Sequence, residues 1–448
     1  MAGKSTPSKK VQRVKSKSRP ISTTALSEPL IAETSSAASF SAFSESGLFF
    51  AHIALAVDKH RLRVFDTESG KAIAESVFQN SRVSAVHWAS LPTSPTDNNA
   101  GAGDETTSRK RKKRKSVSGR EISTEDLIVI GFSNGTLAIF SPRQGEVVRT
   151  LSTPSSNDAI LSIASKPASL SSPHPKLWSS GANGSLCSWD VHAGTLLATW
   201  KISKGTNTPH TAIAIHPSAE DSAPHLLAAR HRIQLFGAPR EEENIPREFA
   251  STTGHASPVI SLDWAPSPVP ESAQMFISAA VGDRFACIWQ LPALDEDEDE
   301  EDEVPEGTLI ASIPFDTDVR FVGYVSPAST GSPKLLAYGL SSSGELRVFA
   351  APSASSASST GKPEPFTSVD GTSITTSPGS PPIVSLCFDA QRPGSLLLAR
   401  LVTGVKPVFD RMVSPMHIDA YMCFHINADR CLSRKSSLKK GVSCQMSN

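Results

Sequence analysis

Three residues in the segment from Thr253 to Leu291 have side chains that could do chemistry: His255, Asp283 and Trp289. A histidine beside a carboxylate can serve as a base or as a ligand, so these residues form a candidate catalytic or ligand-binding set. The alternative is structural: a buried hydrogen-bond network would satisfy the polar groups and fix the register of neighbouring strands. The pattern of the surrounding residues favours the structural interpretation.

Short strands with turn signals surround these residues. Apolar runs at Val259–Trp264, Met275–Val281 and Phe285–Leu291 are separated by a Pro/Ser-rich turn and by the tight turn Gly282-Asp283. Runs of this length between turn residues predict strands. One unit of a few short strands cannot bury its own faces, so it needs neighbours of the same kind.

The pattern recurs along the chain, and its third strand is the clearest part. Seven segments place a Phe or Trp near the end of an apolar run: HRLRVFD (60–66), GTLAIFS (135–141), GSLCSWD (184–190), HRIQLFG (231–237), DRFACIWQ (283–290), GELRVFA (344–350) and GVKPVFD (404–410). Two further strands are expected ahead of each segment, with Phe40–Ser44 the only candidate for the first strand of the first copy. A weaker run after the aromatic residue, such as Thr195–Trp200, predicts a fourth strand.

Seven copies of about four strands predict an all-β fold, a seven-bladed β-propeller. The aromatic residues lie 47 to 75 residues apart, and the longer intervals contain polar insertions at 92–123, 295–307 and 351–380. Surface loops tolerate such insertions at small cost. The alternative, a pair of β-sandwiches or several small β domains, also has regular short strands. It does not account for an aligned aromatic residue after each turn.

Opposite charges balance over the 448 residues but are segregated along the chain. Lys and Arg together number 44, as do Asp and Glu. Residues 1–38 are basic and rich in Ser, Thr and Pro, which predicts disorder. An unbroken acidic run spans Asp295–Glu303. It is interpreted as a solvated loop or as a contact with a basic partner.

An unbroken basic run lies in the first long insertion. It consists of Arg109, Lys110, Arg111, Lys112, Lys113, Arg114 and Lys115. Three interpretations remain open: a nuclear or nucleolar import signal, a contact with RNA phosphates, and a solvated loop without function. No aromatic residue is interleaved with the run, so base stacking is not supported.

The sequence argues against several other classes of protein. No apolar run reaches the roughly 18 residues that a membrane helix needs, and the basic N-terminus lacks the apolar core of a secretory signal. Six cysteines without a Cys-x-x-Cys pair argue against disulfides or a zinc site. The serine-hydrolase elbow, the P-loop and the zinc-protease motif are all missing. We expect a soluble intracellular protein without metal, cofactor or catalytic site.

The repeats resemble WD repeats, which form β-propellers. Gly254-His255, Asp283 and Trp289 match the family's Gly-His pair, turn Asp and Trp, and one copy keeps the literal pair Trp189-Asp190. The resemblance implies that the histidine, the turn aspartate and the tryptophan join a Ser or Thr in a hydrogen-bonded network inside the blade. Ser278 is the candidate for that position. The other copies depart from the pattern, which obscures the boundaries of the blades.

The order of features further resembles the Utp-five type of WD-repeat subunit, which is part of the UtpA (t-UTP) subcomplex of the small-subunit processome. The resemblance covers about residues 40–415. It is carried by IALAVDKHRLRVFDTESGK (53–71), RKRKKRK (109–115), the blade at 253–291, and SLLLARLVTGVKPVFDRMV (395–413).

This resemblance implies a non-enzymatic scaffold in ribosome biogenesis, located in the nucleus and nucleolus. Its partners would be other WD-repeat UtpA subunits and the 5′ external transcribed spacer of pre-rRNA, bound directly or through the complex, without a membrane or a small-molecule substrate. Such a scaffold supports pre-rRNA transcription and early processing of small-subunit rRNA. The alternative is a WD-repeat adaptor of another nuclear complex, in chromatin or as a ubiquitin-ligase substrate receptor.

The resemblance also gives an expected domain organisation. Residues 1–38 form the basic segment and residues 39–415 the propeller. Family members carry a C-terminal helical domain after the propeller, whereas residues 416–448 have no helical apolar period. We therefore expect an irregular tail in place of that domain.

Overall fold

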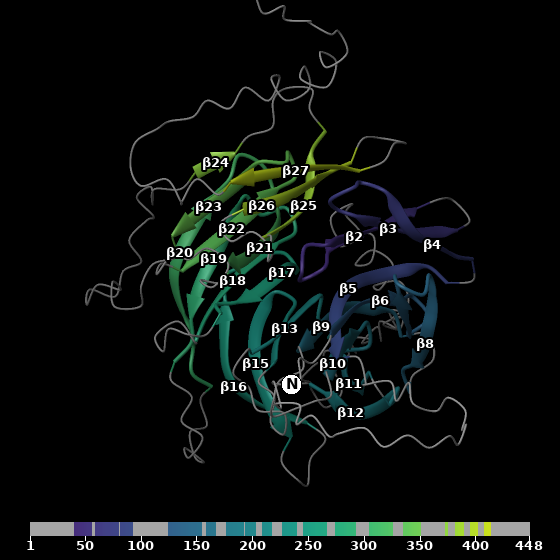
Figure 1. Cartoon of the computed structure of the whole chain (residues 1–448). Helices are drawn as coiled ribbons and strands as arrows, with labels where there is room; N and C mark the ends of the chain where they lie inside the picture. Colours follow the sequence, from purple (N-terminus) through teal and green to yellow (C-terminus); the bar gives the residue numbers. More distant parts are fainter. Residues whose placement is uncertain are drawn as a thin grey trace, which may run out of the picture.

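Seven β-sheets are arranged in a ring in the computed structural model of this chain (Figure 1). The structure describes residues 40–55, 59–79, 81–92, 124–154, 158–166, 176–191, 193–202, 208–216, 226–239, 245–266, 274–292, 304–325, 335–350, 372–374, 381–388, 395–401 and 407–413. The predicted basic segment, the basic and acidic runs and the tail lie outside these residues. Within the described part, no helix is long and apolar enough to cross a membrane.

Each sheet is one blade, formed by strands that are consecutive in the chain. Blades one to three are β1–β12, at Ser41–Phe43, Phe49–Leu55, His60–Asp66, Ala72–Phe78, Val83–Pro92, Thr124–Phe132, Thr136–Ser141, Glu146–Ser152, Ile160–Lys166, Lys176–Gly181, Ser185–Asp190 and Thr195–Lys201. Blades four to six are β13–β24, at Ala212–Ile215, Leu226–Ala229, Arg232–Pro239, Pro246–Thr253, Val259–Trp264, Met275–Ala280, Phe285–Gln290, Thr308–Pro314, Val319–Val325, Leu336–Ser341, Leu346–Ala350 and Thr372–Ile374. Blade seven is β25–β27, at Ile383–Phe388, Ser395–Arg400 and Val408–Val413.

Neighbouring strands pair antiparallel in every blade, with the first strand toward the ring axis and the last toward the rim (Figure 1). Second strands such as β18 are buried on both faces, which explains why they read as continuous apolar runs. The chain is therefore a seven-bladed β-propeller, and the predicted all-β fold is confirmed.

The aligned aromatic residue of each third strand has a structural counterpart. In five blades a β-bulge shifts the register between the third and fourth strands directly before that residue, as at Ser188/Trp189 and Ile288/Trp289. A bulge bends the strand and increases its twist. Six of the seven aromatic side chains are buried, being at most 3% exposed: Phe65, Phe140, Trp189, Phe236, Trp289 and Phe349.

The hydrophobic core is divided among seven seams, each between two neighbouring blades. The seam between blades four and five, for example, contains Trp264, Phe276 and Trp289. The ring is closed by the seam between blades seven and one, where Phe43 and Phe50 pack with Leu397. Each blade thus buries its two faces against its neighbours.

The connections between strands separate the two faces of the ring. Residues 79–82, which join the rim strand β4 to the inner strand β5, can reach about 18 Å, and returning across four strands already takes about 14 Å. This connection is too short to cross the ring as well, so it stays on one face. Because the strands of a blade are antiparallel, the connections from first to second and from third to fourth strands lie on the opposite face. We call that side the insertion face. The basic run lies between β5 and β6, and the acidic run between β19 and β20, so both insertions leave the ring there.

Candidate functional site

Blade five brings together the four predicted network residues. The His255 Nδ1 lies 2.7 Å from a carboxylate oxygen of Asp283, and its Nε2 lies 2.8 Å from the Ser278 Oγ. The Trp289 Nε1 donates to the same Oγ at 2.8 Å. With the aspartate accepting from Nδ1–H, the serine hydroxyl donates to Nε2. The network therefore connects the segment before β17, the strand β18, the turn after it and the strand β19.

Two glycines make this arrangement possible. A Cβ on Gly254 would lie 2.5 Å from Cη2 of Trp289, so a larger residue would collide with the indole ring. Gly282 has a φ of +74°, which is unfavourable for residues with a side chain, and it starts the turn that presents Asp283. The ring of Phe285 stacks on His255 with centroids 6.0 Å apart. The Gly-His pair and the Gly-Asp turn are thus explained by local geometry.

The geometry argues against a catalytic role for this set. Asp, His and Ser are the residue types of a hydrolase triad, but a nucleophilic serine must reach its substrate. Ser278 is 0% exposed, and its Oγ is already bonded to both His255 and Trp289. We therefore propose that the four side chains hold the blade together.

Blade three contains a reduced version of the network, which sequence reasoning missed. Trp189 Nε1 donates to the Ser179 Oγ at 2.9 Å, as Trp289 does to Ser278. Asp158 stands before the first strand, where blade five has its histidine, and accepts from the Asn183 N at 2.8 Å and from the Ser185 Oγ. Burial raises the pKa of the Asp158 carboxyl. The Trp189-Asp190 pair was the available sequence signal, but nothing marked Asp158.

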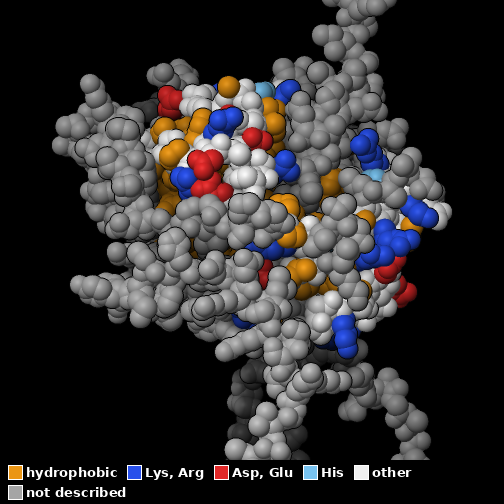
Figure 2. Space-filling view, turned by 90° about the horizontal axis from the view of Figure 1, so that it is seen from above, with side chains coloured by type: hydrophobic (Ala, Val, Ile, Leu, Met, Phe, Trp, Pro, Cys, Tyr) orange, Lys and Arg blue, Asp and Glu red, His pale blue; other side chains and the backbone are white. Residues whose placement is uncertain are grey.

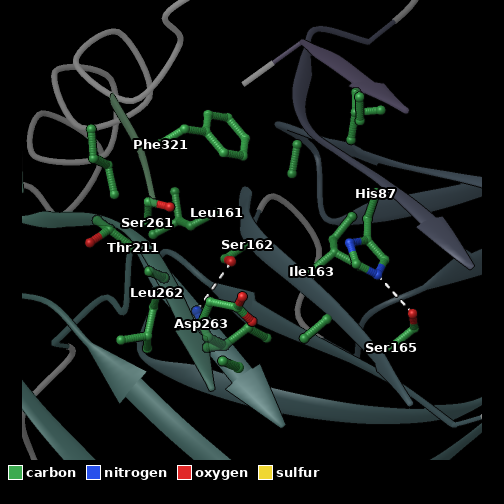
Figure 3. Close-up of a pocket in the computed structure, with 18 of the residues that line it drawn as sticks. His87, Leu161, Ser162, Ile163, Ser165, Thr211, Ser261, Leu262, Asp263 and Phe321 are labelled. Atoms are coloured by element: carbon green, nitrogen blue, oxygen red, sulfur yellow. Dashed lines mark hydrogen bonds between the residues drawn. The ribbon is translucent and has the colours of Figure 1, made fainter. Parts of the chain in front are cut away.

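A cavity of about 330 Å³ lies at the ring axis, lined by the first strands of blades one to six (Figure 3). Aliphatic side chains such as Ile163 and Leu262 share its wall with His87 and Asp263. The His87 Nε2 lies 2.7 Å from the Ser165 Oγ, and burial lowers the pKa of this histidine to about 4. Among the described residues, no group of three or more His, Cys, Asp or Glu side chains could hold a metal ion.

Polar side chains at the cavity wall tie successive inner strands to one another. Each tie uses a Ser, Thr or Asp side chain of one blade and a backbone group of a neighbouring blade. The pairs are Ser165 with Trp88, Ser162 with Ile213, Thr211 with Val259, Ser261 with Val322 and Asp263 with Tyr324. These bonds link β5 to β9, β9 to β13, β13 to β17 and β17 to β21. These polar side chains at the cavity wall thus bond to neighbouring strands and hold the ring together.

Asp263 gives a testable pH dependence. Its carboxylate accepts from the Tyr324 N at 2.8 Å, yet desolvation raises its pKa to about 6. A carboxyl with a raised pKa contributes stability below its unfolded pKa and loses that contribution as pH rises through about 6. Asp263→Asn keeps an acceptor for the amide and removes the charge. We expect the variant to gain about 1–3 kcal/mol over the wild type between pH 4 and pH 7.5, after a discount for the partial exposure of Asp263.

The measurement is urea unfolding of both proteins at each pH. The difference between the two proteins cancels the opposite effect of the partly buried His52 and His87. Desolvation lowers the pKa of both to about 4, so their contribution to stability is lost as pH falls through that value. A difference that stays constant from pH 4 to pH 7.5 would show that Asp263 titrates normally in the folded protein.

Exposed apolar side chains recur on the rim of blades one to three. Gly70, Gly145 and Gly194 close identical turns, in which each glycine N donates to the carbonyl four residues earlier. The third residue after each glycine is apolar and exposed, and these are Ile73 (46%), Val148 (40%) and Leu197 (50%). We call these three residues the rim stripe. One exposed apolar residue thus stands at the same position of the rim strand in three consecutive blades.

The ring is that of a seven-bladed β-propeller, and its His-Asp-Ser-Trp network resembles the one carried by WD-repeat proteins, which are in general non-catalytic scaffolds. The chain resembles WD repeat-containing protein 43 of Homo sapiens, with 26% identity over 252 residues. The matched region is 54% of this chain and 33% of that protein, so it spans a third of the relative's length. No model of a known protein family matches the chain. A chain in the crystal structure of a mitotic checkpoint complex superimposes with a TM-score of 0.49 and 13% identity, covering 81% of this chain and 87% of that chain.

Proposed function

We propose that this protein is a non-enzymatic scaffold in ribosome biogenesis, a UtpA component that supports pre-rRNA transcription and early processing of small-subunit rRNA in the nucleolus. The similarity to human WD repeat-containing protein 43 carries this proposal. The network in blade five and the ties at the channel support a scaffold, because their polar groups are bonded within the ring and are not presented to a substrate.

Two surfaces would provide the binding. The rim stripe offers an apolar contact for other WD-repeat UtpA subunits, since Ile73, Val148 and Leu197 lie on the outer strands of consecutive blades. The insertion face carries the basic run between Pro92 and Thr124, where lysines and arginines can contact the phosphates of pre-rRNA through counterion release. In this proposal the rim stripe binds the protein partners, and the insertion face binds the phosphates of the RNA.

The test is an affinity purification of the tagged full chain, together with microscopy of a fluorescent fusion. Other WD-repeat UtpA subunits and the 5′ external transcribed spacer should be recovered, and the fusion should be nucleolar. The triple variant Ile73→Glu/Val148→Glu/Leu197→Glu should lose the protein partners with little change in melting temperature. Recovery of histones or of a cullin adaptor, with the protein in the nucleoplasm, would support the alternative adaptor function.

The basic run gives a separate prediction. Replacing Arg109–Lys115 with Gly and Ser residues should reduce nucleolar accumulation and leave the melting temperature nearly unchanged, because the insertion joins β5 and β6 without being part of either strand. The measurement pairs microscopy with thermal unfolding. A matched control replaces the acidic run Asp295–Glu303 in the same way, which should leave the protein nucleolar. Unchanged localisation of the first variant would assign import to residues 1–38 or to a partner.

A further inference from the structure

Two arginines share one carboxylate at the rim of blade one. Arg61 and Arg63 lie on the same face of β3 as Phe65, which packs in the seam between blades seven and one. The Nε atom of each arginine lies 3.2 Å from one carboxylate oxygen of Glu75, which stands opposite Arg63 on β4. The two arginine side chains are 38% and 40% exposed. This group therefore carries a net positive charge into the solvent beside the seam.

The shared carboxylate also determines how the two guanidinium groups are presented. A guanidinium has five N–H donors in a rigid fork, and a bond through Nε–H directs the edge formed by its two Nη atoms away from the carboxylate. Such an edge is suited to the oxygens of a phosphate group. Alternate residues of a strand are about 7 Å apart, so Arg61 and Arg63 can each contact a phosphate of their own. Glu75 thus orients both groups before a ligand binds.

A third arginine lies on the other side of the same seam. Arg411 of β27 pairs with Leu397, whose side chain packs in the seam between blades seven and one. Directly opposed residues of paired strands lie on the same face of the sheet, so Arg411 faces blade one, and it is exposed. Its neighbour Asp410 lies on the opposite face. We call Arg61, Arg63 and Arg411 the arginine cluster.

A partly exposed aromatic ring lies beside these arginines. The ring centroid of Phe409 is 6.5 Å from that of Phe65, which is on the same face of β3 as Arg63. Phe409 is likewise on the same face of β27 as Arg411. Figure 2 views the side of the ring that carries β27 and β3, and Lys and Arg side chains lie there over blade one beside hydrophobic ones. The rim of the seam thus combines arginines with an aromatic ring.

This combination matches a single-stranded nucleic acid. Proteins that bind single strands combine a positively charged groove along the backbone with aromatic side chains on which bases stack. A phosphorylated peptide would use the arginines alone. We propose that the rim of the seam between blades seven and one binds single-stranded RNA, with the arginine cluster on the phosphates and Phe409 against a base. The choice of RNA over DNA rests on the proposed function, and the contact lies on the ring itself, apart from the basic run.

Binding of a labelled oligouridine of about 12 nucleotides to the purified full chain tests this surface. Arg109–Lys115 are replaced with Gly and Ser residues throughout, so that the basic run cannot supply the affinity. Arg61→Gln/Arg63→Gln should weaken binding about tenfold or more, because two charged hydrogen-bond donors are lost. The slope of log K against log salt should become shallower by about 1.4, since each phosphate contact to a single strand contributes about 0.7.

Arg143→Gln/Arg284→Gln is the matched control for charge. It removes two exposed arginines from turns of blades two and five, and it should change the affinity by less than about twofold. Phe409→Leu keeps an apolar side chain in the seam and removes the ring, so it should weaken binding about fivefold or more without changing the salt slope. Melting temperatures of all variants report whether the ring of blades is intact.

Three results would overturn the proposal. They are no binding by the chain that lacks the basic run, equal binding by the Arg61→Gln/Arg63→Gln variant and its control, and full binding by Phe409→Leu. The last result, with loss of binding in the arginine variant, would assign the surface to a phosphorylated protein. These measurements use the purified chain alone, so their failure would leave the scaffold function to the affinity purification described above.

Discussion

Trp289→Ala is expected to lower the free energy of unfolding by about 3–5 kcal/mol. The indole is 3% exposed and lies in the seam between blades four and five, stacked on Phe276 with centroids 6.3 Å apart. Its removal leaves a cavity that the fixed strands on either side cannot fill. It also removes the Nε1–H group that donates a hydrogen bond to the Ser278 Oγ at 2.8 Å. Urea unfolding followed by circular dichroism measures the loss.

Trp289→Phe separates the two contributions. Phenylalanine keeps most of the ring volume but has no Nε1–H, so this variant should lose about 1–3 kcal/mol. Combined with Ser278→Ala, it should show a coupling energy of about 0.5–3 kcal/mol, because the two residues share a buried bond. Additive effects would mean that the hydrogen bond contributes nothing beyond the packing.

The same variants distinguish a structural network from a catalytic one. A nucleophilic serine could be changed to alanine with loss of activity and little loss of stability, because active-site groups are seldom essential for folding. Ser278 is fully buried and holds both His255 and Trp289. Ser278→Ala should therefore destabilise blade five and leave partner binding at the rim stripe intact.

The number of blades could be predicted because the signal is local and repeated. Each copy needs a turn, a short apolar run and an aromatic residue, and these lie within a few residues of one another. The structure adds the reason for the alignment, since a β-bulge precedes Phe65, Phe140, Trp189, Phe236 and Trp289. In these five copies the position of the aromatic residue thus coincides with a shared feature of the backbone.

The contacts between blades could not be predicted in the same way. Asp263 bonds to the amide of Tyr324, 61 residues further along the chain, and Thr211 bonds to Val259. Ser, Thr and Asp are common in strands and turns, so neither their type nor their spacing marks a partner in another sheet. Asp158 was missed for the same reason. It stands where blade five has its histidine, and its carboxylate accepts a hydrogen bond from the backbone N–H of Asn183, in the turn between β10 and β11.

The closing seam is the part of the ring that depends most on side chains. Blades one to seven are joined in sequence by chain connections, but blades seven and one meet only at the ends of the described ring. Phe43, Phe50, Phe65 and Phe409 fill this seam, and Phe43 and Phe50 have centroids 4.9 Å apart. Among the described residues, no short chain connection joins blades seven and one, so these side-chain contacts hold the seam.

Phe50→Ala should therefore lower the free energy of unfolding by about 3–5 kcal/mol and open the ring at this seam first. Phe50 is 0% exposed, and its loss removes contacts with both Phe43 and Phe409. Hydrogen exchange should accelerate in β1, β2 and β25–β27 before it does in the other blades.

Phe236→Ala is the matched control, since Phe236 is 1% exposed in the seam between blades three and four. Those blades remain joined by residues 202–211, so the control should lose similar stability without selective exchange at the closing seam. Equal exchange patterns in the two variants would mean that the ring unfolds as one unit and that its closure is no weaker than its other seams.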